Sequence, residues 1–212
     1  MNAIAVRRWA IAIAPALAGI LTVVGTMADP LPPGQGAELV EAYAENPGPL
    51  NIKSLAYHFA YALWLAVVFP LVGLVRGRGG WLANIAGLLA FLGISTIPGF
   101  LITDFIDSAM GQTVGAEAAV RVGEVAQRFW AFPVMAGPGF AGLMLALPLA
   151  TIAAWRAGVL VWWGAAAAVA GIAAFAVFGA MLLGNSILAA AFVVLSVALA
   201  RLKYEPAAAL ES

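Results

Sequence analysis

The feature that most constrains the fold is a series of long apolar segments that carry almost no charge. The segment at 81–106 is one example, since Asp104 is its single charged residue. A helix needs about 20 apolar residues to cross the hydrocarbon core of a bilayer. Across the whole chain 64% of the residues are hydrophobic and 9% are charged, whereas a soluble domain has about 25% charged residues. The sequence therefore predicts an integral membrane protein.

Six segments of this kind are predicted to cross the membrane as helices. They lie at 4–27, 54–75, 81–106, 129–154, 158–179 and 187–202, within a single membrane domain that covers 1–212. The turn before the last and shortest segment is expected at Gly184, Asn185 and Ser186, with Asn185 as a turn residue. The expected fold class is an all-α polytopic membrane protein, built as a bundle of six transmembrane helices.

Two polar connections are predicted on the extracytoplasmic side, at 28–53 and 107–128. In the first, Glu38, Glu41 and Glu45 recur at helical spacing between flanks rich in proline and glycine. In the second, acids and bases alternate at spacings of four, three and four residues, at Glu117, Arg121, Glu124 and Arg128. Each pattern predicts a short amphipathic helix.

The distribution of basic residues predicts the orientation. With the amino terminus in the cytoplasm, only Lys53, Arg121 and Arg128 of the ten basic residues fall outside. Short cytoplasmic loops of membrane proteins are enriched in lysine and arginine. Both termini are therefore predicted to be cytoplasmic. The abundance of alanine and glycine indicates a bacterial genome, and hence the plasma membrane of a bacterium.

Composition and motifs exclude several kinds of site. The chain has no cysteine and one histidine, so disulfides, thiolate nucleophiles and cysteine-ligated metals are excluded. A net charge of zero gives no basic footprint for nucleic acid. The Gly-rich phosphate loop and the HExxH, GxSxG and CxxC motifs are absent. No metal ion, cofactor or nucleic-acid partner is predicted.

The segments at 54–75 and 81–106 form a hairpin that carries the candidate catalytic residues. Its turn centres near residue 78, so positions that sum to about 156 lie at similar depth if both helices rise about 1.5 Å per residue. Lys53 is then level with Asp104, and His58 is level with Pro98. Ionisable residues within a membrane segment often mark functional sites. We therefore predict acid/base roles for His58, Asp104 and Asp107.

A second group of residues is predicted to bind a ligand beside them. Tyr61 shares a helical face with His58, and Thr96 and Thr103 share one with Asp107. Lys53 and Arg128 are the cations placed to hold an anionic group. The predicted ligand-binding residues are Lys53, Tyr61, Trp64, Thr96, Thr103, Glu124, Arg128 and Trp130.

These residues also have purely structural interpretations, which the sequence leaves open. His58 can be neutral and hydrogen-bonded to Tyr61 or to the carbonyl that Pro98 leaves free. Asp104 and Asp107 can face water at the end of their helix. The outer residues fit a solvated helix face and an interfacial aromatic belt, at Glu124, Arg128 and Trp130.

The functional hypothesis is an outward-facing polar pocket above an apolar floor. Such a pocket would bind a lipid-like or amphipathic small molecule and transform it by acid/base chemistry, as a cyclase, isomerase or hydrolase does. The alternative is a non-enzymatic accessory subunit of a membrane complex or a homo-oligomer, docked through small-residue pairs such as Gly164 and Ala168. A transporter is the weaker alternative, because no acidic residue lies in mid-membrane.

Overall fold

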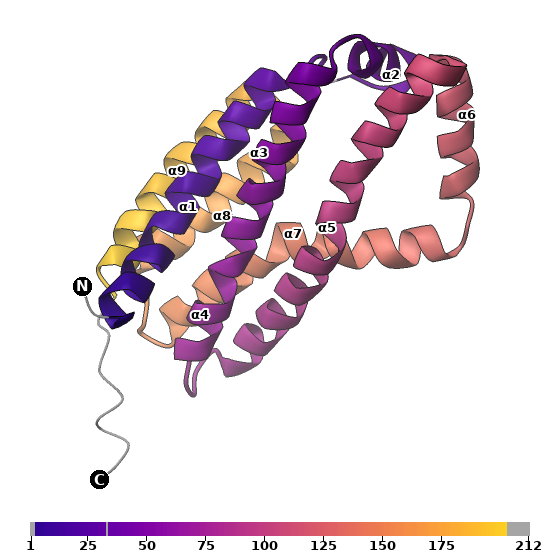
Figure 1. Ribbon diagram of the computed structural model, residues 1–212. Helices are drawn as coiled ribbons and strands as arrows, with labels where there is room; N and C mark the ends of the chain where they lie inside the picture. Colours follow the sequence, from indigo (N-terminus) through magenta and orange to yellow (C-terminus); the bar gives the residue numbers. More distant parts are fainter. Residues whose placement is uncertain (1–2, 33, 203–212) are drawn as a thin grey trace.

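The computed structural model describes residues 3–32 and 34–202, and within these ranges the chain folds into helices without strands (Figure 1). In chain order the helices are α1 (Ala3–Ala28), α2 (Gly36–Glu45), α3 (Pro47–Ala66), α4 (Val68–Leu74), α5 (Gly80–Val114), α6 (Ala116–Gln127), α7 (Ala131–Arg156), α8 (Trp162–Phe178) and α9 (Leu182–Ala200). With α3 and α4 taken together, 5 helices are long and apolar enough to cross a membrane, and α8 is shorter at 17 residues. The predicted class, an all-α multi-pass membrane protein, agrees with this architecture.

The second membrane segment is longer than the sequence predicts. It covers Pro47–Leu74, 28 residues, although 47–53 were assigned to the outer connection. The prolines at 47 and 49 stand in the first turn, where their missing N–H groups cost nothing and their fixed φ favours a helix. Lys53 and Ser54 therefore lie inside a helix. The break at Val67 separates α3 from α4 and precedes Pro70, whose missing N–H leaves the Ala66 carbonyl without its usual helical donor.

Helix α5 also continues beyond its predicted end at 106. It runs for 35 residues to Val114, so the first part of the predicted outer connection is helical. The short helices α2 and α6 pack against this outer part of α5. Gly111 gives α2 its close approach, since a Cβ there would lie 3.0 Å from Val40 and Ala44. Both predicted amphipathic helices are present, and α2 buries Val40 and Tyr43 while its glutamates stay exposed.

The predicted turn at 184–186 is wrong. Helix α8 ends at Gly179, which has a φ of 61°, and α9 already begins at Leu182. Glycine adopts this left-handed conformation without strain, which explains the position of the turn. Asn185 is therefore a fully buried residue in the first turn of α9.

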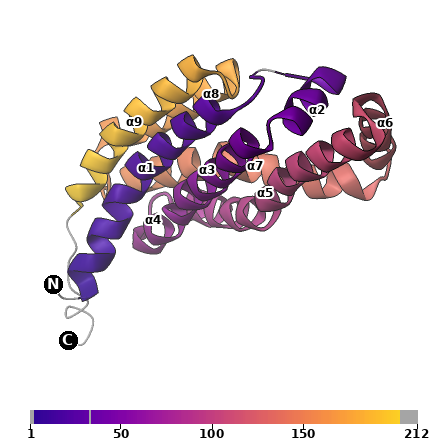
Figure 2. The same ribbon diagram turned by 45° about the horizontal axis from the view of Figure 1, so that its top comes forward.

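The long helices form two groups joined by α3. Helix α9 packs against α1 and α8, and α5 packs against α7; α3 lies between α1 and α5 (Figures 1 and 2). Small residues allow these close contacts: a Cβ on Gly164 of α8 would lie 2.6 Å from Ala198 of α9. The start of α1 and the end of α9 lie at the same end of the bundle, where Arg8 Nη2 donates to the Ala200 carbonyl at 2.7 Å.

Candidate functional site

A cavity of about 370 Å³ lies among α2, α3, α5, α7 and α8, beneath the segment that connects α1 to α2. It is open on one side, because its lining includes Phe140, which is 47% exposed. Its polar lining residues are Asp29, Tyr43, Lys53 and Asp104, together with the phenols Tyr57 and Tyr61. Most of the remaining lining is apolar, including Ile97, Phe100, Phe140, Leu143, Met144 and Phe175.

The polar and apolar linings lie at different depths. Tyr61 stands eight residues after Lys53 on α3, and Ile97 stands seven residues before Asp104 on α5. At about 1.5 Å per residue these separations correspond to roughly 10–12 Å along the helices. The cavity thus has a charged end near α2 and an apolar, aromatic end toward the middle of the bundle.

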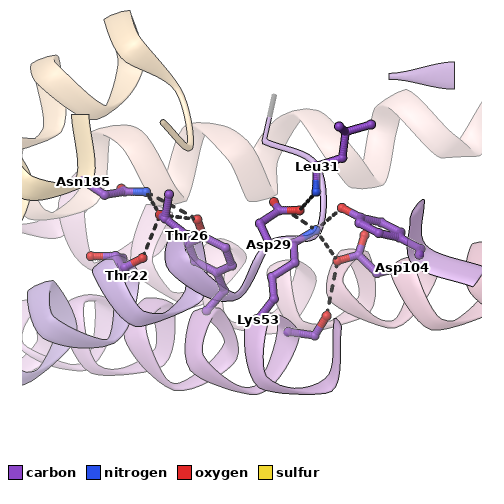
Figure 3. Close-up of polar contacts among 10 residues, drawn as sticks. Thr22, Thr26, Asp29, Leu31, Lys53, Asp104 and Asn185 are labelled. Carbon is purple, nitrogen blue, oxygen red and sulfur yellow. Dashed lines mark hydrogen bonds and ion pairs between the residues drawn. The ribbon is translucent and has the colours of Figure 1, made fainter. Parts of the chain in front are cut away.

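Lys53 is the centre of the charged end. Its Nζ lies 3.2 Å from Asp104 Oδ2 and 3.6 Å from Asp29 Oδ2, and it also donates to the Tyr43 hydroxyl. The lysine side chain is 9% exposed, and those of Asp29 and Asp104 are 8% and 19% exposed. Buried charges are costly unless they are paired, and here both carboxylates pair with the one lysine (Figure 3).

Further hydrogen bonds hold the two carboxylates in place. Ser54 Oγ donates to Asp104 Oδ2 at 3.3 Å, and the Leu31 N–H donates to Asp29 Oδ1 at 3.3 Å. Because Leu31 follows Asp29 by two residues, the second bond is a local turn that fixes the aspartate over the cavity. The site is thereby assembled from three separate parts of the chain: the end of α1, α3 and α5.

Tyr43 joins α2 to this cluster. Burial, and then the negative charges of Asp104 and Asp29, raise the pKa of the Tyr43 phenol well above its usual value. The phenol therefore stays protonated at neutral pH. The Tyr43 backbone is held separately, since Ser108 Oγ donates to its carbonyl at 2.8 Å.

A second polar network lies beside the ion cluster. Thr26 Oγ1 lies 2.8 Å from the Tyr57 hydroxyl, and Asn185 Nδ2 donates to both groups. Figure 3 shows Thr26 and Asn185 on one side of the view and Lys53 on the other. The network links α1, α3 and α9, and it orients the Tyr57 ring that lines the cavity.

Thr26→Val is expected to lower the free energy of unfolding by about 1 kcal/mol, because the buried Tyr57 and Asn185 groups lose a shared partner. Steric trapping in bicelles measures this change. Thr113→Val is the matched control, since the exposed Thr113 hydroxyl bonds only to carbonyls of its own helix. Equal effects of the two substitutions would show that the network does not stabilise the fold.

His58 lies outside this cavity. It lines a separate surface groove of about 430 Å³ between α3 and α5, with Pro98 and Phe105. The predicted level match of His58 with Pro98 therefore agrees with the structure. Within the described residues His58 makes no hydrogen bond, either to Tyr61 or to a carbonyl freed by Pro98. The rise per residue predicts how deep a side chain lies in the bundle, but not which way it points. His58 follows Tyr57 by one residue, which corresponds to a rotation of about 100° around the helix, so His58 points away from the cavity.

The other predicted residues divide between the cavity and the periphery. Tyr61, Lys53 and Asp104 line the cavity, and Trp64 lies directly beneath it, fully buried against Tyr61 and Phe175. The residues that the structure leaves outside the lining are Thr96, Thr103, Asp107, Glu124, Arg128 and Trp130. Thr96 packs against Gly139 of α7, and the hydroxyl of Thr103 donates to its own helix.

Sequence reasoning missed four residues of this region: Asp29, Tyr43, Tyr57 and Asn185. Two of them carried a usable signal. Asp29 follows an apolar helix directly, in a chain with only 10 acidic residues, and Tyr43 lies on the turn opposite the glutamates of α2. Within the described residues no group of three or more acidic or histidine side chains is placed to hold a metal ion. The cavity lining offers one lysine, two carboxylates, three phenols and apolar side chains.

The arrangement has the form of a binding site for a small molecule: an open, largely apolar cavity with a few convergent polar groups. Comparison with known proteins finds no family model, no curated protein and no solved structure that matches this chain.

Proposed function

We propose that this protein binds an amphipathic or lipid-like small molecule in the cavity below α2. The observation that carries the proposal is the division of the cavity into a charged end, centred on Lys53, and an aromatic end at Tyr61 and Phe175. A molecule with a polar head and an apolar tail satisfies both ends at once. An entirely apolar ligand would displace water from the charged end and would offer no polar group in its place.

The membrane arrangement that goes with this proposal has six crossings and two cytoplasmic termini. In support, the start of α1 and the end of α9 lie at the same end of the bundle. The turn between α4 and α5, which carries Arg76 and Arg78, and the end of α7 at Arg156 lie toward this end as well (Figure 1). A bias of basic residues toward one side is typical of the cytoplasmic face. The charged end of the cavity then faces the exterior of a bacterial plasma membrane, and α8 crosses as a short sixth helix.

The acid/base pair suggested by the sequence is not part of this proposal. His58 and Asp104 line different cavities, so they do not face one bound molecule. The proposed activity is binding, for which the charged end of the cavity takes the polar head group and the aromatic end takes the tail.

The accessory-subunit alternative has less support. It relied on small-residue faces that would dock a partner, but a Cβ on Gly164 or Gly171 would lie within 3 Å of Ala198 or Ala191 of α9. The small-residue faces of α8 are therefore covered within the chain, whereas Gly73 and Gly77 have no described neighbour within 4 Å of an added Cβ. The role of the covered faces is to bring α8 and α9 close together.

Photolabelling tests the proposed binding. The protein is placed in phosphatidylcholine nanodiscs and exposed to twelve-carbon amphiphiles that carry a diazirine at the tail end. We expect saturable labelling of Met144, Phe175 or their neighbours, located by peptide mass spectrometry. Ala180→Trp should reduce this labelling several-fold, because Ala180 is an exposed lining residue and an indole there fills space at the cavity entrance.

Ala180→Ser is the matched control, since it changes the same position with little added volume. Labelling that does not saturate, or that falls only on lipid-facing residues, would contradict the proposed function. Labelling that is unaffected by Ala180→Trp would place the bound tail elsewhere and would also contradict it.

A further inference from the structure

The charged end of the cavity carries more negative than positive charge. Asp29 and Asp104 contribute two carboxylates, and Lys53 is the only basic residue in the lining. The formal balance is one negative charge. Asp107, three residues beyond Asp104, is the next ionisable group on α5, and it is acidic as well. Arg121 of α6 and Arg128, which follows α6, are exposed, and Arg121 pairs with Glu117 of its own helix at 3.8 Å.

Lys53 can bind an incoming anion only if it gives up contacts that it already makes. Its Nζ already lies within 3.6 Å of both carboxylates and donates to Tyr43. An anionic head group would have to compete with two buried aspartates for one cation. A cationic head group does not face this competition. Both carboxylates pair with the same lysine, and each keeps unused acceptor capacity.

The aromatic lining favours the same sign of charge. Six aromatic side chains line the cavity, those of Tyr43, Tyr57, Tyr61, Phe100, Phe140 and Phe175. The faces of such rings attract cations, with larger effects where water is excluded. The fold already uses this attraction, since Lys53 Nζ lies 4.2 Å from the centre of the Tyr43 ring. The Tyr61 hydroxyl makes no hydrogen bond to the described part of the chain, so its oxygen remains available to accept one.

From the charge balance and the aromatic lining together, we infer that the cavity is selective for amphipathic cations: molecules with an ammonium head group and an apolar tail. This inference rests on the proposed function and specifies its ligand. Because Lys53 Nζ already lies between the two carboxylates, the head group contacts Asp29 and Asp104 from the side of the cavity. The tail follows the aromatic wall toward Phe175.

The test compares three diazirine-tailed probes with the same twelve-carbon tail: dodecyltrimethylammonium, dodecyl sulfate and dodecylphosphocholine. Nanodiscs of phosphatidylcholine keep the surface potential of the bilayer near zero. The concentration that half-saturates labelling of the cavity peptides is measured for each probe. We expect the cationic probe to half-saturate at a concentration at least ten-fold lower than the anionic probe does.

Asp29→Asn supplies the decisive variant. The amide oxygen still accepts from the Leu31 N–H, and the pair between Lys53 and Asp104 remains, so the fold is preserved. The charge at this end of the cavity becomes zero. Binding of the cationic probe should weaken about ten-fold, which corresponds to about 1.4 kcal/mol, and binding of dodecylphosphocholine should change less than two-fold. Glu41→Gln, which removes the same charge from an exposed position on α2, should leave all three probes unchanged.

The outcomes separate the two proposals. Saturable labelling of the cavity in which the anionic or zwitterionic probe binds as well as the cation overturns the inference and leaves the proposed function standing. Cation binding that is unchanged in Asp29→Asn, or equally weakened in Glu41→Gln, also overturns the inference. No saturable labelling of the cavity by any of the three probes overturns both.

Discussion

Lys53→Met is expected to lower the free energy of unfolding by about 3–5 kcal/mol, which is the usual cost of removing one partner from a buried ion pair. Methionine fills much of the same space, so loss of packing contributes little. The large term comes from Asp29 and Asp104, whose carboxylates are 8% and 19% exposed and would lose their cation. Steric trapping in bicelles measures the unfolding free energy of the variant and of the parent protein.

Two further variants separate this effect from a general loss of charge. Arg121→Met removes a cation from a pair that is 67% exposed on the arginine side, and exposed pairs contribute about 0.5 kcal/mol or less. Lys53→Met combined with Asp29→Asn and Asp104→Asn should recover most of the lost stability, because no uncompensated charge remains. If Lys53→Met costs no more than Arg121→Met, then the cluster is solvated and the electrostatic account of the cavity is wrong.

The depth of the polar residues could be predicted from the sequence. Counting from the turn near residue 78 placed Lys53 level with Asp104, and their charged atoms lie 3.2 Å apart. The same count placed His58 level with Pro98, and both line the groove between α3 and α5. This works because the helical rise is nearly constant and because the turn between the two helices is short.

The direction of the side chains could not be predicted in the same way. Tyr57 and His58 are neighbours in the sequence, yet Tyr57 lines the cavity and His58 lines the outer groove. In a soluble helix, the hydrophobic stripe indicates which face is buried. In a membrane helix both faces are apolar, so this signal is lost. The sequence therefore does not show which face of α3 carries the single histidine.

Contacts between distant parts of the chain could not be predicted from the sequence either. Asp29 lies in the predicted outer connection at 28–53, where the sequence assigns it no role, and Asn185 is predicted in a turn. Their positions depend on how the end of α1 meets α3 and α9, which is decided by packing between helices that are far apart in sequence. The six-residue polar lining thus combines one predicted pair, Lys53 and Asp104, and the predicted Tyr61 with three residues that only the fold brings in.

The packing of α5 against α7 supports the floor of the cavity. A substitution at this contact is expected to have the second large effect on the free energy of unfolding. At Gly142 an added Cβ would clash with the Leu89 carbonyl oxygen and would lie 2.7 Å from the Gly93 nitrogen. Both are backbone atoms, so no side chain can move aside, and the two helices would have to separate. Ile97 and Leu143, which line the cavity, are close to this contact in sequence.

Gly142→Ala is therefore expected to lower the free energy of unfolding by about 3 kcal/mol, at the upper end of the usual cost of overpacking. Gly99→Ala is the matched control on α5, because its added Cβ would meet no neighbouring part of the described fold within 4 Å and the residue that follows is not proline. That substitution should be neutral or should stabilise α5 by a few tenths of a kcal/mol up to about 1 kcal/mol, since alanine has the higher helix propensity.

The same pair of variants tests whether the cavity depends on this contact. Separation of α5 from α7 moves the wall formed by Phe100 and Phe140, whose ring centres lie 5.0 Å apart. Gly142→Ala should therefore also weaken labelling by dodecyltrimethylammonium several-fold at a temperature where the variant is still folded, and Gly99→Ala should not. Unchanged stability in Gly142→Ala would mean that α5 and α7 are not packed backbone to backbone at this position. Lost stability with unchanged labelling would mean that the cavity wall is held by α3 and α8 instead.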